Sequence, residues 1–318
     1  MDGVQKALNG TVPPPFDPRC FHRRIEVYAL PPAAAEVIRL TQSSEVDADD
    51  VAAAVEKDPG LALRLVQMSN CSLFARLEQI CSVGEAVRFL GFRAVRLAAV
   101  SLLLKALRDD DNGDPRQEAY WRHALTVSVA ARHLSRAKRV WHPDEAFLAA
   151  LLMDIAVPVI LKMDLPCYER MLGPDRGHPD PLEEGDCLGA HHGDLAADCL
   201  EKWGIPDHVV AAVRGHHFPE TVVTPPEARP FAVLLEMAHG LADCLCRGEE
   251  GVSDMAARVG RFWCGELGFL PEELGPFLDH LTEEVAAASA VFELDVDVSP
   301  DWAALAAHDF PPPSVAST

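Results

Sequence analysis

The chain has 318 residues, 49% of them hydrophobic, and its 28 basic and 49 acidic side chains give a formal net charge of −21. This length and apolar fraction allow one large or two ordinary domains with a buried core, and exclude a disordered chain. Because a strong negative field repels phosphate backbones and anionic lipid headgroups, we expect no direct binding to nucleic acid or to a membrane.

The N-terminal segment and the cysteines indicate a cytoplasmic protein. Residues 1–18 lack the basic region and apolar core of a secretory signal. The most apolar run, 147–161, is too short to span a bilayer. The nine cysteines include no C-x-x-C pair, so we expect most of them to be small buried hydrophobes in a reducing compartment.

The first third of the chain is helical by pattern, after a Pro-rich segment at 1–20 that reads as a loose arm. No run has strand periodicity. Gly91 separates the last two of the helices predicted here, because it follows the apolar pattern as a helix C-terminal glycine does. The predicted helices are 32–40, 47–56, 59–70, 82–90 and 93–107. We therefore expect a compact N-terminal helical bundle.

A polar segment at 108–116 is the best internal boundary, and two helices with candidate functional residues follow it. In the first, His123 shares its helical face with apolar residues one, two and three turns later, so it points inward. In the second, Asp154 is embedded among apolar residues. An ionised carboxylate in such a place needs a partner or a metal. Pro158 disturbs this second helix.

The rest of the chain is also helical by pattern. A loop rich in Gly and Pro is predicted at 173–185, a Pro-rich linker at 221–230 and a tail at 311–318. Helices are expected at about 188–203, 209–214, 231–246, 252–267 and 271–292. The predicted fold is all-α, an N-terminal bundle packed on a second helical lobe, with a C-terminal helical extension at 226–310. Whether the extension packs on the second lobe or forms a homodimer surface stays open.

Long segments resemble the signatures of a known family. DPGLALRLVQMSN at 58–70 and SVGEAVRFLGFRAVRLAAVSLLL at 82–104 resemble the N-terminal signature of the HDOD domain, a bacterial signalling module. HHGDLAADCLEKWGIPDHVVAAVRGHH at 191–217 resembles its C-terminal signature. The resemblance implies an HDOD domain at 21–225 whose second lobe is HD-like. It also implies a regulatory role, usually without demonstrated catalysis.

HDOD domains are related to HD-domain phosphohydrolases, which bind one or two divalent metals through a first histidine, a His-Asp pair, further histidines and a last aspartate. By this resemblance, His123 matches the first histidine. The His-Asp pair falls on Met153-Asp154, so Met153 replaces the pair's histidine.

The later ligands of the pattern are also matched in this chain. His192 and either His216 or His217 match later histidines, and the last aspartate maps onto His239, with Asp243 one turn away. The candidate metal ligands implied by the resemblance are His123, Asp154, His192, His216 and His239.

Met153 predicts a degenerate metal site. A thioether is a weak, soft donor, whereas hydrolytic sites use imidazole and carboxylate. We therefore expect no bound cofactor and no catalysis; the alternative is a weakly held Fe, Mn or Zn ion. The structural interpretation is that His123 is a core histidine with Asp154 as its hydrogen-bond partner. Loss of such a pair would destabilise the lobe by about 3–5 kcal/mol.

The leading hypothesis is a non-catalytic signal-transduction module that binds proteins or small ligands. The family resemblance implies partners such as histidine kinases, response regulators or cyclic-dinucleotide enzymes. One alternative is a metal-dependent phosphohydrolase acting on a nucleotide or phosphate ester, and a second is a nucleotide-sensing binding protein. Motifs of other catalytic classes, such as a P-loop, a nucleophile elbow or H-E-x-x-H, are absent from the sequence.

Overall fold

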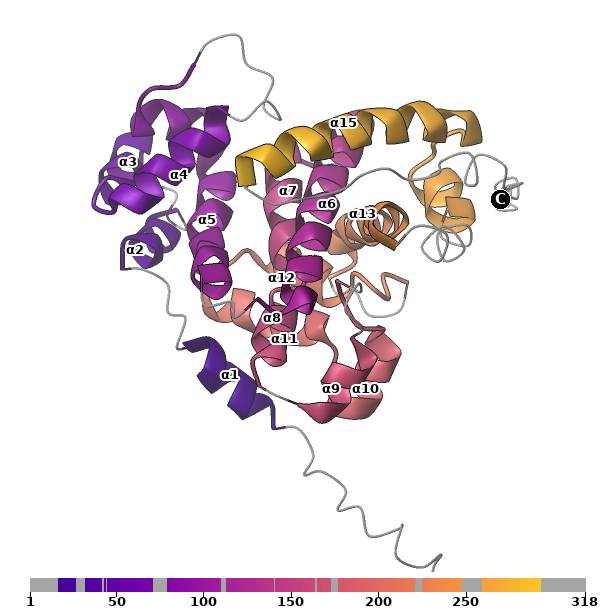
Figure 1. Ribbon diagram of the computed structural model, residues 1–318. Coiled ribbons are helices and arrows are strands. Elements are labelled where there is room, and N and C mark those ends of the chain that lie inside the picture. Colours follow the sequence, from indigo (N-terminus) through magenta and orange to yellow (C-terminus); the bar gives the residue numbers. More distant parts are fainter. Residues whose placement is uncertain are drawn as a thin grey trace, which may run out of the picture.

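The computed structural model describes residues 17–292 except 27–31, 42, 44, 71–78, 110–112, 140, 164, 173–176, 221–224 and 248–258. Every regular element within these ranges is helical (Figure 1), which confirms the predicted all-α fold. No helix among them is both long enough and apolar enough to cross a bilayer. The predicted tail and most of the predicted arm lie outside the described residues.

The N-terminal bundle consists of α2 (Pro32–Leu40), α3 (Ala48–Val55), α4 (Pro59–Asn70) and α5 (Val83–Asp109). Asp47 caps α3, because its side chain accepts hydrogen bonds from the backbone N–H groups of Asp49 and Asp50. Gly91 interrupts α5 with a φ of 75°, at the predicted break between two helices. The bundle meets the rest of the protein where α5 packs on α7 (Figure 1).

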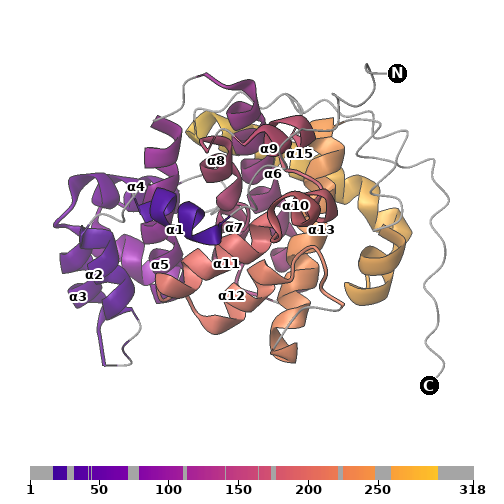
Figure 2. The same ribbon diagram turned by 90° about the horizontal axis from the view of Figure 1, so that it is seen from below.

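The second lobe is built around α6 (Pro115–Lys138), which begins at an Asp114 cap. Helices α7 (Pro143–Leu152) and α13 (Arg229–Arg247) pack on α6, and α12 (Asp207–Arg214) packs on α11 (His192–Lys202) and on α13 (Figure 2). Helix α13 belongs to this lobe, although the sequence placed it in the C-terminal extension. The lobe therefore brings together residues more than 100 positions apart in the chain.

The helix predicted around Asp154 is broken into α7 and α8 (Ala156–Leu161). We expect Asp154 inside a helix from the sequence, but the structure places it in the turn between α7 and α8. In an uninterrupted helix the ring of Pro158 would clash with the carbonyl group of Asp154, four residues earlier. The chain instead turns before the proline, which sits in the first turn of α8, where no N–H group is needed.

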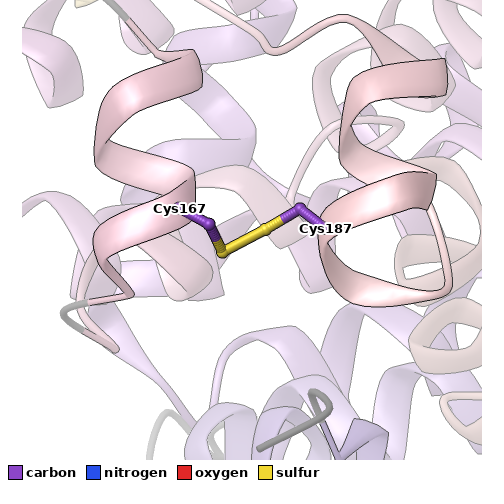
Figure 3. The surroundings of a disulfide bond; sticks show 2 residues. All are labelled: Cys167 and Cys187. Atoms are coloured by element: carbon purple, nitrogen blue, oxygen red, sulfur yellow. A yellow bond between two sulfur atoms is a disulfide. The ribbon is translucent and has the colours of Figure 1, made fainter. Parts of the chain in front are cut away.

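Three short helices were not predicted: α1 (Pro18–Glu26), α9 (Pro166–Met171) and α10 (Pro181–Leu188). Helix α1 begins inside the expected arm and packs on α8 and α11. Helix α10 begins inside the predicted loop, at an Asp180 cap followed by a first-turn proline. A disulfide between Cys167 and Cys187 joins α9 to α10 (Figure 3). Two of the nine cysteines thus differ from the expected reduced state.

The C-terminal part continues through the short helices η2 (Pro226–Ala228), η3 (Val259–Glu266) and η4 (Pro271–Glu273) to α15 (Leu274–Phe292). Helix α15 lies across α6 (Figure 1). Glu284 of α15 is 3.2 Å from His133 Nδ1 and 3.5 Å from Arg136 Nη1, both on α6. The described part of the extension therefore packs on the second lobe.

Candidate metal centre

Four buried side chains from three parts of the chain form a first cluster. His123 lies on α6, His178 lies just before α10, and His239 and Asp243 lie one turn apart on α13; one ligand atom from each is within 4.8 Å of the others. Asp243 is their common neighbour, because its Oδ1 atom is 2.8 Å from His178 Nε2 and 3.9 Å from His123 Nδ1. Its Oδ2 atom is 4.0 Å from His239 Nδ1.

A second cluster of the same kind consists of Asp154, His192, His216 and His217, again with ligand atoms within 4.8 Å of one another. Asp154 comes from the turn after α7, His192 begins α11, and the two adjacent histidines follow α12. Asp154 Oδ1 is 3.3 Å from His192 Nε2 and 3.4 Å from His216 Nε2. His217 Nε2 is 2.7 Å from His192 Nε2.

The two clusters adjoin and form what we call the two-part centre. The ring of His217 in the second cluster lies 5.0 Å from that of His239 in the first, measured between centroids. The corresponding distance from His178 to His217 is 6.4 Å. Six imidazoles and two carboxylates thus meet inside one lobe. Imidazole and carboxylate ligands of this kind fit a divalent ion of Zn, Mn or Fe.

Hydrogen bonds outside the clusters orient three of the histidine rings. The Nδ1 atom of His192 is 2.7 Å from Glu184 Oε2, that of His216 is 2.6 Å from a backbone carbonyl, and that of His178 is 3.1 Å from another. Each Nδ1–H therefore donates outward, which leaves Nε2 as the atom that faces the cluster. Metal-binding histidines are held in this way, usually by a carboxylate or a carbonyl group.

The charges around His192 fix where a proton sits in the metal-free centre. Burial lowers the pKa of His192, but the charges of Glu184 and Asp154 outweigh burial and raise that pKa to about 10. Burial raises the pKa of Asp154, but the neighbouring His192 and His216, whose Nε2 atoms lie 3.3 and 3.4 Å from Asp154 Oδ1, hold that pKa well below its usual value. Burial and the neighbouring histidines lower the pKa of His217. The metal-free centre thus holds an imidazolium at His192 and a neutral His217 beside it.

Two glycines allow backbone to approach the clusters closely. A Cβ atom at Gly177 would lie 2.5 Å from His123 Cβ and 2.8 Å from the Ala119 carbonyl oxygen. A Cβ atom at Gly193 would lie 3.1 Å from Cε1 of His216. The backbone at Gly177 therefore contacts His123 directly, and any side chain at position 177 would displace the segment that carries His178.

Replacing Gly177 by alanine is expected to weaken metal binding at the first cluster, because the new methyl group would push His178 away from Asp243. Cobalt(II) titration of the metal-free protein, followed by its visible absorption, measures the loss of one binding event. Gly275→Ala, far from both clusters on α15, is the matched control, because nothing lies within 4 Å of a Cβ atom there. Two binding events at wild-type affinity in Gly177→Ala would contradict this assignment.

The structure places all five sequence-predicted candidates in the two-part centre: His123 and His239 in the first cluster, and Asp154, His192 and His216 in the second. The expectation that Asp154 is the hydrogen-bond partner of His123 is wrong. Asp154 lies beside His192 and His216, while the carboxylate near His123 is that of Asp243.

Three members of the centre were missing from the predicted set. In the sequence, His217 is an alternative to His216 and Asp243 an alternative to His239, although the i,i+4 spacing of His239 and Asp243 puts both on one helical face. His178 stands in a segment read as a loop, and nothing in its sequence surroundings marks it as a ligand. Neither cluster needs the imidazole that Met153 replaces, because each already has four potential ligands.

Comparisons with known proteins agree with this fold. The HDOD domain model matches residues 27–219. An uncharacterized protein of Treponema pallidum (strain Nichols) is 22% identical over 203 residues, which cover 60% of this chain but only 38% of that relative. The chain thus spans less than half the length of this curated relative.

Two solved structures resemble the chain over most of its length. A protein of Shewanella amazonensis SB2B, provisionally described as a metal-dependent phosphohydrolase, has a TM-score of 0.60 at 18% identity, covering 85% of this chain and 97% of its own. An HDOD domain protein with unknown function from Geobacter sulfurreducens has a TM-score of 0.57 at 17% identity, covering 87% and 99%. At these identities the likeness shows a shared fold.

Proposed function

The chain belongs to the HDOD family, whose domain covers more than half of its residues, and from this premise we propose that it is a signalling module regulated by divalent metal bound in its HD-like lobe. The observation that carries the proposal is the outward hydrogen bonding of three buried histidines, which turns Nε2 of each toward a carboxylate. Fe, Mn and Zn are the metals whose chemistry matches imidazole and carboxylate ligands.

The burial of the centre favours a regulatory role over a catalytic one. No side chain of the eight is more than 6% exposed. Each cluster also offers four potential protein ligands, as closed structural metal sites do, whereas catalytic sites keep a ligand position open. The side chains come from α6, α11, α13 and the segments between helices, so bound metal would fix these elements relative to one another. For partners we propose signalling proteins such as histidine kinases, response regulators or cyclic-dinucleotide enzymes, by analogy with the family.

Metal-dependent hydrolysis of a phosphate ester is the second candidate, and the closeness of the two clusters favours it. The 5.0 Å between the rings of His217 and His239 would bring two ions near each other, as two-metal hydrolytic sites require. When bound, such ions would supply Lewis acidity toward a phosphoryl group and a water molecule. The chain itself orients the ligands through Glu184 and excludes bulk water by burying them.

Chelation followed by reloading tests both candidates. At a metal concentration a hundredfold above Kd, the proposed role predicts a rise in thermal midpoint of about 5 °C or more. It also predicts no turnover of p-nitrophenyl phosphate or its bis ester. An unchanged midpoint with every divalent metal would contradict metal regulation. Metal-dependent turnover that disappears in Asp154→Asn would establish the second candidate instead.

A further inference from the structure

The disulfide between Cys167 and Cys187 encloses two residues that serve the two-part centre. The bridge closes a segment with a sequence separation of 20 residues. His178, a member of the first cluster, lies inside this segment. So does Glu184, whose Oε2 atom accepts hydrogen bonds from both the backbone N–H and the Nδ1–H of His192 in the second cluster.

Beyond the two hydrogen bonds that Glu184 accepts from His192, few contacts among the described residues hold helix α10. Only Glu184 and Leu188 of its eight residues are buried. An isolated helix of this length is unstable in water, and the internal Gly185 weakens it further. The helix packs mainly against α9, the helix to which the disulfide ties it (Figure 3). The cross-link to α9 therefore adds to the two hydrogen bonds that fix the position of Glu184.

Helix α9 supplies the other side of the same contact. Tyr168, next to Cys167, is fully buried. Burial raises the pKa of the Tyr168 hydroxyl well above its usual value, and the negative charge of the nearby Glu184 adds to this rise. Since Cys187 is one turn after Glu184, the disulfide clamps the two helices beside the place where Tyr168 meets Glu184.

We propose that the Cys167–Cys187 pair is a thiol/disulfide switch that sets the metal affinity of the two-part centre, an inference that rests on the proposed metal binding. In the oxidised chain the closed segment holds His178 and Glu184 ready for the metal, and a preorganised site binds more tightly because less ordering is left to do. In the reduced chain α10 is free to leave α9, and both residues lose their fixed positions.

The switching step is a thiol–disulfide exchange with a dithiol. One thiolate of the dithiol attacks a sulfur of the bridge, breaks the S–S bond and forms a mixed disulfide. The second thiol of the dithiol closes on the first and releases the remaining cysteine. Two electrons and two protons pass to Cys167 and Cys187, which become thiols, and the dithiol becomes a cyclic disulfide. Oxidation by a disulfide of the same class reverses the step.

The test compares cobalt(II) affinity in the oxidised and reduced forms of the full chain, prepared metal-free and freed of reductant. Loss of an outer-shell partner typically weakens metal binding ten- to hundredfold, so we expect the reduced form to bind roughly ten- to hundredfold more weakly. The variant Cys167→Ser/Cys187→Ser should bind like the reduced wild type under both conditions. Cys20→Ser/Cys81→Ser, which removes two free cysteines, should keep the full redox response.

The outcomes separate this inference from the proposed function. Equal cobalt affinity in the oxidised and reduced wild type would overturn the switch while leaving metal binding intact. A redox response that persists in Cys167→Ser/Cys187→Ser would also overturn it. Failure of the oxidised wild type to bind cobalt at all would overturn the proposed function itself. Because the first comparison uses the wild type alone, it stands even where the double variant fails to fold.

Discussion

Asp154→Asn is expected to weaken metal binding at the second cluster by more than a hundredfold, while the free energy of unfolding of the metal-free protein changes by no more than about 1–2 kcal/mol. The substitution removes the only carboxylate among the four ligands of that cluster. In the metal-free protein, however, Asp154 and Glu184 face the same ring, that of His192. Removing the Asp154 charge takes away an interaction with His192, but it also relieves the repulsion between Asp154 and Glu184. The two effects partly cancel in the free energy of unfolding.

Calorimetric titration with cobalt(II) and urea unfolding of the chelated protein measure the two effects. Asp194→Asn is the matched control, since Asp194 also contacts a histidine but is 35% exposed and outside both clusters; both quantities should stay at their wild-type values. If Asp154 were only a structural relic, Asp154→Asn would destabilise the metal-free protein by about 3–5 kcal/mol and leave metal binding unaffected.

Metal affinity at the second cluster is expected to rise about tenfold for each pH unit between pH 7 and 10. The charges of Glu184 and Asp154 overcome the effect of burial and raise the pKa of His192 to about 10 in the metal-free centre. The ring is therefore protonated at neutral pH, and a metal must displace that proton to reach Nε2. As pH rises through the pKa, the proton leaves unaided and the dependence levels off.

Isothermal titration at pH 7.5 in buffers of different ionisation enthalpy counts the protons released. We expect about one proton per ion bound at the second cluster. In Asp154→Asn, which lacks one of the two charges that raise the pKa of His192, residual binding should release fewer protons. Binding that releases no proton and is independent of pH would show that His192 is not a ligand.

The helices of the N-terminal bundle could be predicted because local signals specify them. Asp47 and Asp58 mark helix starts, since each accepts hydrogen bonds from backbone N–H groups of the helix that follows, and Gly91 marks a break. The break at Asp154 was harder to place. Pro158 predicts that the helix is interrupted. The clash, however, involves the carbonyl group four residues earlier, so the chain turns before the proline.

The site was only partly predictable, because its geometry depends on packing between distant elements. His123 and Asp154 stood out as polar residues on apolar helices, yet periodicity could not show that they belong to different clusters. That separation follows from α13, which packs on α6 and brings Asp243 to His123. His178 gave no signal because a histidine in a Pro-rich segment has no defined direction until α10 forms.

The same limit applies to the disulfide. Cys167 and Cys187 lie on helices that the sequence did not predict, and nothing in a 20-residue spacing indicates a bridge. Two sulfur atoms meet only because α9 and α10 pack side by side, which local sequence signals do not encode. The proposed switch therefore rests on the part of the fold that sequence patterns describe least well.

The most direct test of the two-part centre is anomalous X-ray diffraction from crystals of the reloaded protein, recorded on both sides of the absorption edge of the bound metal. We expect two peaks per chain, one among His123, His178, His239 and Asp243 and one among Asp154, His192, His216 and His217. Well-ordered rings with no anomalous peak at either position would contradict the account.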